Sequence, residues 1–180
     1  MAERTDEELM RAYVAGDHAA FRELFTRYAP MLMRLTVRHL RSDELAREVV
    51  QQTFFQVHAA RNDFHQDRKL RPWVFTIAMN LVREHYRKQK RRSETGLDEA
   101  REPAVQGERG PIEQRQRVEL LRAALERLPD TQREVVELHW LEERPFAEVA
   151  EIVGSTEGAV RVRAHRAYKR LKELLGKELE

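Results

Sequence analysis

The sequence predicts an all-α protein: two small helical domains joined by a flexible acidic linker, with a helix-turn-helix in the C-terminal domain. Three observations lead to this fold class. Apolar residues recur at helical spacing along most of the chain, and no segment alternates convincingly as a strand. Residues 93–112 hold glycines, prolines and almost no apolar side chain, which is typical of a linker. The spacing of residues 146–171 is that of two helices around a tight turn. The predicted domains are therefore 1–92 and 113–180.

The first helices follow from their start signals and apolar spacing. Thr5 and Glu8 form a predicted capping box, and Gly16 with Asp17 ends this helix. A second helix over 18–39, with Pro30 as a possible kink, is expected to bury Phe21, Leu24, Phe25, Tyr28, Leu32 and Leu35. Ser42 starts a third helix that runs to about residue 60 and carries Leu45, Val49, Phe54 and Val57 inward. Residues 61–70 are polar and predict a loop.

A fourth helix, from Pro72 to about Arg92, has an apolar side and a basic side. The predicted apolar side consists of Val74, Ile77, Ala78, Leu81 and His85. The opposite side carries Asn80, Arg83, Arg87, Lys90 and Arg91. Residues 80–92 hold six Lys or Arg against one Glu, a charge of +5. An asparagine among arginines suits contacts with base edges and phosphates together.

The loop before this helix brings amide, aromatic and imidazole groups next to its basic side. Unstacked single-stranded bases are held by stacking and by amide hydrogen bonds, so Asn62, Asp63, Phe64 and His65 are candidate contacts. A structural alternative remains open, in which Phe64 anchors the core and the preceding residues form an ordinary turn. Trp73 is predicted to belong to the core because it opens the apolar side of its helix.

The C-terminal domain is predicted to contain helices over 113–127 and 131–141, the second with a capping box of Thr131 and Glu134, followed by the helix-turn-helix. Ala150, Gly154 and Val160 supply the small residue, the turn glycine and the β-branched packing residue. Val160, Ala164, Ala167, Tyr168 and Leu171 form an apolar stripe on the last helix. The groups away from it or on its flanks are Arg161, Val162, Arg163, His165, Arg166 and Lys169.

The charge of this last helix predicts DNA binding. Residues 155–172 hold six Lys or Arg against one Glu, again +5, which suits a helix lying in a DNA major groove. The alternative is a solvated helical hairpin with a basic outer face. Between the two basic segments, residues 93–115 hold six acidic residues and three arginines, a charge of −3.

Composition and motifs exclude several other classes of protein. Without cysteine the chain can form neither a disulfide nor a zinc–thiolate site. The charged start is unlike a secretory signal, and no segment is long and apolar enough for a membrane span, so we expect a cytoplasmic protein. The seven histidines are scattered, and neither a phosphate loop nor a paired nucleophile is recognisable, so we expect no enzyme activity, metal or cofactor.

The order of these parts resembles a group IV sigma factor of bacterial RNA polymerase, the extracytoplasmic function (ECF) class. The resemblance covers nearly all of the chain except the linker, through residues 46–58, 71–92, 125–140 and 146–168. It implies that promoter DNA and core RNA polymerase are the partners. The helix over 72–92 and the 62–65 loop would read and melt the −10 element, and the helix over 156–171 would read the −35 element.

The resemblance also implies a polymerase-binding surface and a regulator. Contacts with the clamp helices of the largest polymerase subunit would fall on Asp43, Glu44, Glu48, Gln51 and Gln52. The flap region of the polymerase and an anti-sigma factor are further implied partners. The chain departs from the family pattern at Glu84, where aspartate is frequent, and at Val162, where serine is frequent. A two-module helix-turn-helix regulator that does not bind core polymerase, or a scaffold protein, is the alternative.

Overall fold

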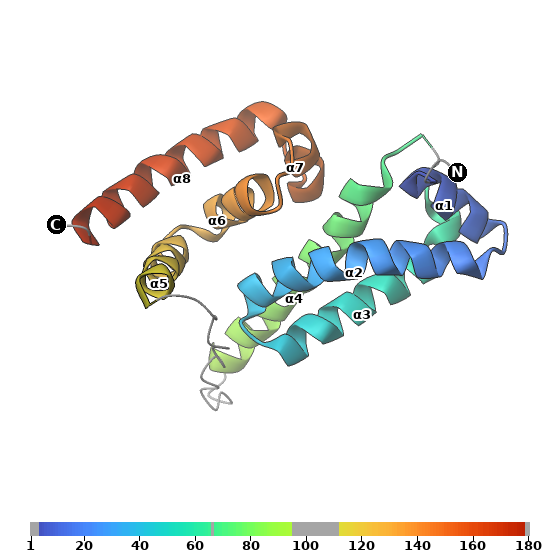
Figure 1. The fold of residues 1–180 in the computed structure, drawn as a ribbon, viewed down its shortest axis with the longest axis horizontal. Helices are drawn as coiled ribbons and strands as arrows, with labels where there is room; N and C mark the ends of the chain where they lie inside the picture. Colours follow the sequence, from blue (N-terminus) through green and yellow to red (C-terminus); the bar gives the residue numbers. More distant parts are fainter. Residues whose placement is uncertain (1–3, 66, 95–111, 179–180) are drawn as a thin grey trace. The chain divides into compact units, whose positions relative to one another are not determined.

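The computed structural model describes residues 4–65, 67–94 and 112–178, and every regular element in these ranges is helical (Figure 1). The chain divides into two compact units, Met1–Val105 and Gln106–Glu180. The first unit contains α1 (Asp6–Val14), α2 (His18–Leu40), α3 (Asp43–Ala59), the 3-10 turn η1 (Arg61–Asp63) and α4 (Leu70–Glu94). The second contains α5 (Ile112–Glu126), α6 (Asp130–Val136), the π-helical turn η2 (Glu137–Leu141), α7 (Phe146–Val153) and α8 (Glu157–Glu178). The all-α prediction is therefore confirmed, whereas most of the predicted linker lies outside the described residues.

The start signals in the first unit act as predicted. The Glu8 amide donates to the Thr5 hydroxyl at 3.2 Å, and the Thr5 amide donates to the Glu8 carboxylate at 2.7 Å. These bonds form a capping box and lower the pKa of Glu8. The Ser42 hydroxyl caps α3 by accepting from the Leu45 amide at 3.3 Å. The second helix continues through Pro30 to Leu40.

The core of the first unit forms where α2 packs against α1 and α3, and α3 against α4. Leu24, Tyr28, Leu32 and Leu35 are buried as predicted. Phe25 is not: 46% of it is exposed, so its assignment to the core was wrong. The rings of Phe25 and Phe54 nevertheless lie 4.6 Å apart, because Phe25 sits at the edge of the α2–α3 contact.

The buried face of α4 is rotated from the predicted one. Val74 and Ala78 are buried as expected, but their buried companions are Phe75, Met79 and Val82. Ile77, Leu81 and His85 are only half-buried. The rotation has a physical cause: Phe75 and Met79 are larger apolar groups, and turning them inward removes more apolar surface from water.

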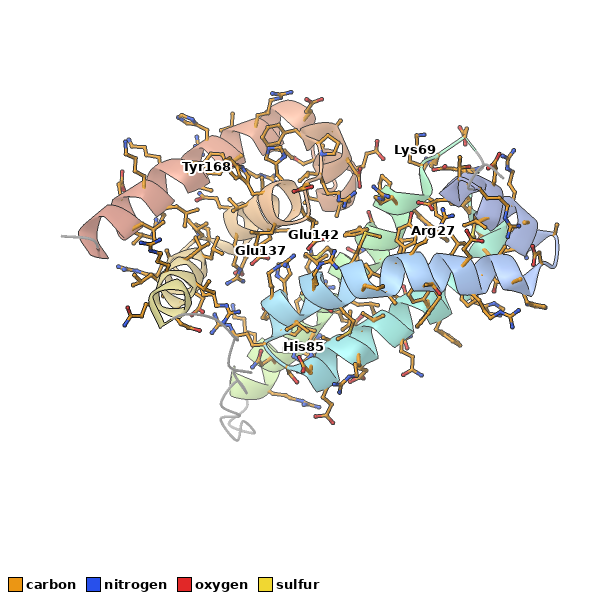
Figure 2. The ribbon with its side chains drawn as sticks, in the orientation of Figure 1. Arg27, Lys69, His85, Glu137, Glu142 and Tyr168 are labelled. Carbon is orange, nitrogen blue, oxygen red and sulfur yellow. The ribbon has the colours of Figure 1, made fainter. Side chains whose placement is uncertain are left out.

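The second unit packs α5 and α6 against α8 around a small apolar cluster. Its members are Ala124, Leu125, Leu128, Val136, Ala167 and Leu171. The predicted capping box at Thr131 was wrong, because α6 begins one residue earlier, with Pro129 at the cap position and without a side-chain cap hydrogen bond. The segment after α6 is π-helical, and two acidic side chains, Glu137 and Glu142, are buried there (Figure 2).

Candidate nucleic-acid interface

The turn between α7 and α8 forms as the sequence predicts. Gly154 ends α7 with φ +64°, a left-handed conformation in which a glycine avoids the steric cost of a side chain. The Thr156 hydroxyl then accepts from the Ala159 amide at 3.2 Å and caps the start of α8. The predicted stripe faces inward, because Val160, Ala164, Ala167 and Leu171 are buried and Tyr168 is half-buried. Burial also raises the pKa of Tyr168 to about 12.

Most of the predicted contact residues on α8 are accessible. Arg161, Val162, His165, Arg166 and Lys169 are exposed, whereas Arg163 is half-buried. The sequence thus correctly separated the inner face of α8 from its outer face. Arg163 lies between the two faces and offers less of its side chain to a partner.

Arg161 is held in place by two neighbours that were not predicted, Glu157 and Phe146. Its guanidinium donates to one Glu157 oxygen, from Nε at 3.1 Å and from Nη2 at 2.6 Å. The same group lies 5.0 Å from the centre of the Phe146 ring, within the range of a cation–π contact. Phe146 in turn stacks on His139, with ring centres 3.8 Å apart. The i, i+4 spacing of Glu157 and Arg161 was the signal available in the sequence.

The basic face of α4 is also accessible, although part of it is engaged in contacts along the helix. Asn80, Arg87, Lys90 and Arg91 are exposed and Arg83 is half-buried. Arg83 donates to the Asn80 side-chain oxygen at 2.8 Å, which orients the amide. Glu84 pairs with Lys88 at 2.7 Å, and this hydrogen bond lowers the pKa of the Glu84 carboxyl. Glu84 and Lys88 therefore offset each other's charge on this face.

The loop before α4 contains the short turn η1, where the sequence predicted no regular structure. Asn62, Asp63 and His65 are exposed, while Phe64 is half-buried with its ring centre 5.1 Å from that of Trp73. Trp73 is itself half-buried, so its predicted place in the core was only partly right. The two aromatic rings pack together at the start of α4, next to exposed amide and carboxylate groups.

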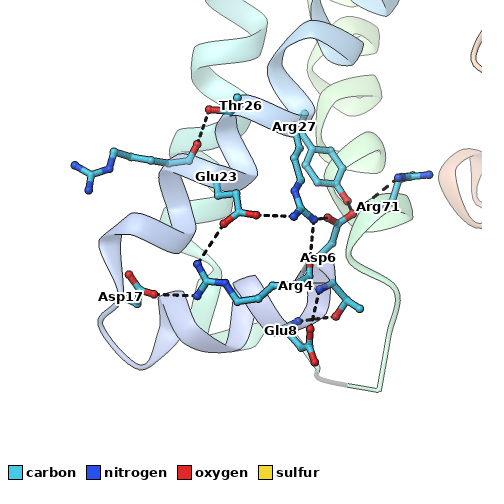
Figure 3. A network of polar contacts seen from close by, with 11 residues as sticks. Arg4, Asp6, Glu8, Asp17, Glu23, Thr26, Arg27 and Arg71 are labelled. Atoms are coloured by element: carbon cyan, nitrogen blue, oxygen red, sulfur yellow. Dashed lines mark hydrogen bonds and ion pairs between the residues drawn. The ribbon is translucent and has the colours of Figure 1, made fainter. Parts of the chain in front are cut away.

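A polar network fixes α1 to α2 and to the start of α4 (Figure 3). Its centre is Asp6, which accepts from the Tyr28 hydroxyl at 2.5 Å and from Arg27 at 2.9 Å, and lies 3.9 Å from Arg71. Beside it, the Glu7 carboxylate accepts from the Leu70 amide at 3.1 Å. The first turn of α4 is therefore stabilised by a carboxylate from 63 residues earlier in the chain.

The outer surface of α3 is polar, as predicted, and borders an apolar groove. Glu44, Glu48, Gln51 and Gln52 are exposed, and Asp43 is half-buried in the first turn. The groove, of about 560 Å³, lies between α2 and α3. Phe25 and Phe55 line it, with 46% and 64% of their areas exposed. Phe55 was not predicted as part of this surface, although an aromatic residue off the buried stripe was the available signal.

Among the residues that the structure describes, no group of three or more His, Asp or Glu side chains is placed so that it could hold a metal ion. Within the same ranges, no helix is long and apolar enough to cross a membrane.

Two helical units, each exposing a basic helix, are typical of a DNA-binding protein with two modules, and comparison with known proteins identifies its family. Residues 24–92 match the family model for sigma-70 region 2, and residues 118–171 match that for sigma-70 region 4. The chain belongs to the sigma-70 family, as an ECF RNA polymerase sigma factor that directs transcription initiation.

Relatives and solved structures agree with this family over nearly the whole chain. The RNA polymerase sigma factor CarQ of Myxococcus xanthus is 33% identical, over 95% of this chain and 97% of its own. The ECF sigma factor SigM of Mycobacterium tuberculosis is 32% identical, over 97% of this chain and 86% of its own. The structure of CnrH in complex with the cytosolic domain of CnrY covers 96% of this chain and 97% of its own, with a TM-score of 0.75 and 27% identity. RpoE of Bartonella quintana, in complex with the anti-sigma factor NepR, covers 87% and 96%, with a TM-score of 0.73 and 25% identity.

Proposed function

We propose that α8 reads the −35 element of the promoter from the major groove. Its accessible face carries Arg161, Val162, His165, Arg166 and Lys169, with Arg163 at the flank. An arginine donates to guanine O6 and N7 through two hydrogen bonds, and lysine neutralises phosphates without reading sequence. Because Glu157 and Phe146 hold Arg161, this arginine loses less conformational freedom when it meets a base.

The second part of the proposal assigns the −10 element to α4 and the loop before it. Asn80, Arg83, Arg87, Lys90 and Arg91 follow the DNA along the basic face. Asn62, Asp63 and Phe64 lie at the start of the helix and take up a base that leaves the stack. Support comes from the exposed amides and from the aromatic pair of Phe64 and Trp73, since aromatic stacking stabilises unstacked bases.

The third part places core polymerase on α3. Glu44, Glu48, Gln51 and Gln52 form its exposed polar face, and Asp43 lies in its first turn. These side chains contact the clamp helices of the largest subunit, and the second domain, 113–180, contacts the flap region. The predicted domains of 1–92 and 113–180 thus bind both polymerase and DNA, and the linker over 93–112 joins them so that each increases the local concentration of the other.

The chain is also proposed to be regulated by an anti-sigma factor. The solved structures of CnrH and of Bartonella RpoE each contain a further protein, in the second case an anti-sigma factor. By this likeness, an anti-sigma factor binds the present chain and competes with core polymerase. The chain acts in the cytoplasm, belongs to group IV of the family, and works as an initiation factor without enzyme activity of its own.

The observation that carries this assignment is that two exposed basic helix faces, α4 and α8, fall in the segments that match regions 2 and 4. Run-off transcription with core polymerase and a promoter library tests it. We expect selected templates to share one sequence element near −35 and another near −10. Selection of one element alone would contradict the division of roles between α4 and α8.

A charge-reversed variant tests the surface on α3. Glu48→Lys should weaken binding to core polymerase and should lower transcription from every promoter equally. Arg22→Glu, a charge reversal at an exposed position of α2 outside the surfaces assigned to polymerase and DNA, is the control and should bind core polymerase like the parent chain. Equal binding of both variants would move the polymerase contact away from α3.

A further inference from the structure

One exposed apolar side chain interrupts the charged outer face of α8. Val162 has 51% of its area exposed, whereas the inward stripe of the same helix is between 0% and 8% exposed at Val160, Ala164, Ala167 and Leu171. On the helix surface its neighbours are the residues three and four positions away. Two of these, His165 and Arg166, are exposed and belong to the proposed DNA-reading face.

A second observation concerns the neighbour of Val162 one turn earlier. Gly158 is exposed and helical, and a Cβ added there would meet no heavy atom within 4 Å. The protein itself therefore has room for a side chain at this position. Glycine is a weaker helix former than alanine, and packing within the protein does not require it at this position. Glycine does allow close approach by a partner.

Gly158, Val162 and Arg166 are exposed and follow one another at four-residue spacing along one face of α8. In the major groove, the one apolar group that distinguishes a base pair is the 5-methyl of thymine, which makes contact with apolar side chains. We propose that Val162 reads the 5-methyl group of a thymine in the −35 element, and that Gly158 leaves the space for this base pair to approach. Val162 is thus a specificity-determining residue. This inference rests on the proposed placement of α8 at the −35 element.

The test removes the methyl group and nothing else. Core polymerase reconstituted with the full chain selects −35 sequences from a promoter library, and each selected thymine, on either strand, is then replaced by deoxyuridine. At one position we expect the parent chain to lose about fourfold in promoter affinity, the factor that corresponds to removing one methyl-sized group from an apolar contact. With Val162→Ala, the fourfold difference between thymine and deoxyuridine promoters should shrink, because the variant lacks the two γ-methyl groups of valine.

Two further variants make the result specific. Val14→Ala, at a valine that is 42% exposed on α1, is the matched control and should keep the fourfold discrimination. Gly158→Ala should lower promoter affinity although alanine favours the helix. The inference is overturned if the parent chain binds deoxyuridine promoters as well as thymine promoters at every −35 position, or if Val162→Ala keeps the discrimination.

A comparison with Arg166→Ala separates this inference from the proposed function. If Arg166→Ala leaves all −35 preferences unchanged, the placement of α8 at the −35 element is wrong. If Arg166→Ala shifts these preferences while Val162→Ala does not affect the thymine position, only the assignment of Val162 is wrong.

Discussion

Glu143 adopts a left-handed backbone conformation, with φ +54°, between the π-helical turn and α7. For a residue with a Cβ this conformation costs about 1–2 kcal/mol, and glycine avoids the cost. Glycine also loses more conformational entropy on folding, about 0.5–1 kcal/mol. The difference predicts that Glu143→Gly stabilises the second unit by about 0.5–1 kcal/mol. Its side chain is exposed, so its removal leaves no cavity.

A glutamate-to-glycine substitution at a helical site separates the backbone strain at Glu143 from the entropy cost of glycine. Glu151 is exposed within α7, and Glu151→Gly should destabilise the unit by about 0.5–1 kcal/mol because only the entropy cost remains. Urea unfolding followed by Trp140 fluorescence, with Trp73 replaced by Phe, measures both changes. The gap between the two variants equals the strain at Glu143. If the two variants destabilise the unit equally, the left-handed conformation is not strained.

Four more predictions concern DNA reading and stability. Arg166→Ala should cost about 1–3 kcal/mol of promoter affinity at one base pair in a binding assay, whereas Lys169→Ala should weaken all sequences alike and reduce the salt dependence. Asn80→Ala should lower permanganate reactivity at the start site while closed-complex binding stays near the parent value; an equal loss of both would contradict a role in melting. Tyr28→Phe removes a partly buried hydrogen bond to the Asp6 carboxylate and should cost about 1.5–3 kcal/mol in urea unfolding. Burial lowers the pKa of His85 below its usual 6.5, so the unfolded chain binds the proton more readily than the folded chain. The free energy of unfolding should therefore fall as pH drops through 6.5, and His85→Gln should reduce this pH dependence.

The sequence predicted best where local rules and packing agree. In α8 the apolar stripe is narrow and the rest of the helix is charged, so only one face could turn inward. In α4 the first half is apolar on more than one side, and the sequence could not decide whether Ile77 or Phe75 would be buried. That choice depends on the surfaces of α2 and α3, which are far away in the sequence. Phe25 shows the same limit, since its spacing fits the core but the α2–α3 contact ends beside it.

In the candidate sites, too, features set by the local sequence were predicted and features set by tertiary packing were not. Charge and spacing located the exposed faces of α4 and α8, because exposure needs no knowledge of a partner element, whereas the polar face of α3 was named from the family resemblance. The contacts that orient single side chains were not predictable in this way. Phe146 meets Arg161 only because the turn at Gly154 folds α7 back against α8, and that geometry is tertiary.

The hydrogen bond from the Leu70 amide to Glu7 shows that the first unit depends on residues that lie outside its family match. The region 2 match begins at residue 24, after α1 has ended. A chain shortened to that residue would keep the basic face of α4 and the polar face of α3. It would also lose the carboxylate that completes the first turn of α4, together with the Asp6 contacts to α2 and Arg71. Such a fragment would fray at the N-terminal end of α4, where Trp73 and Phe64 meet. A loss of promoter binding by this fragment would therefore reflect the absence of α1 as well as the DNA contacts themselves.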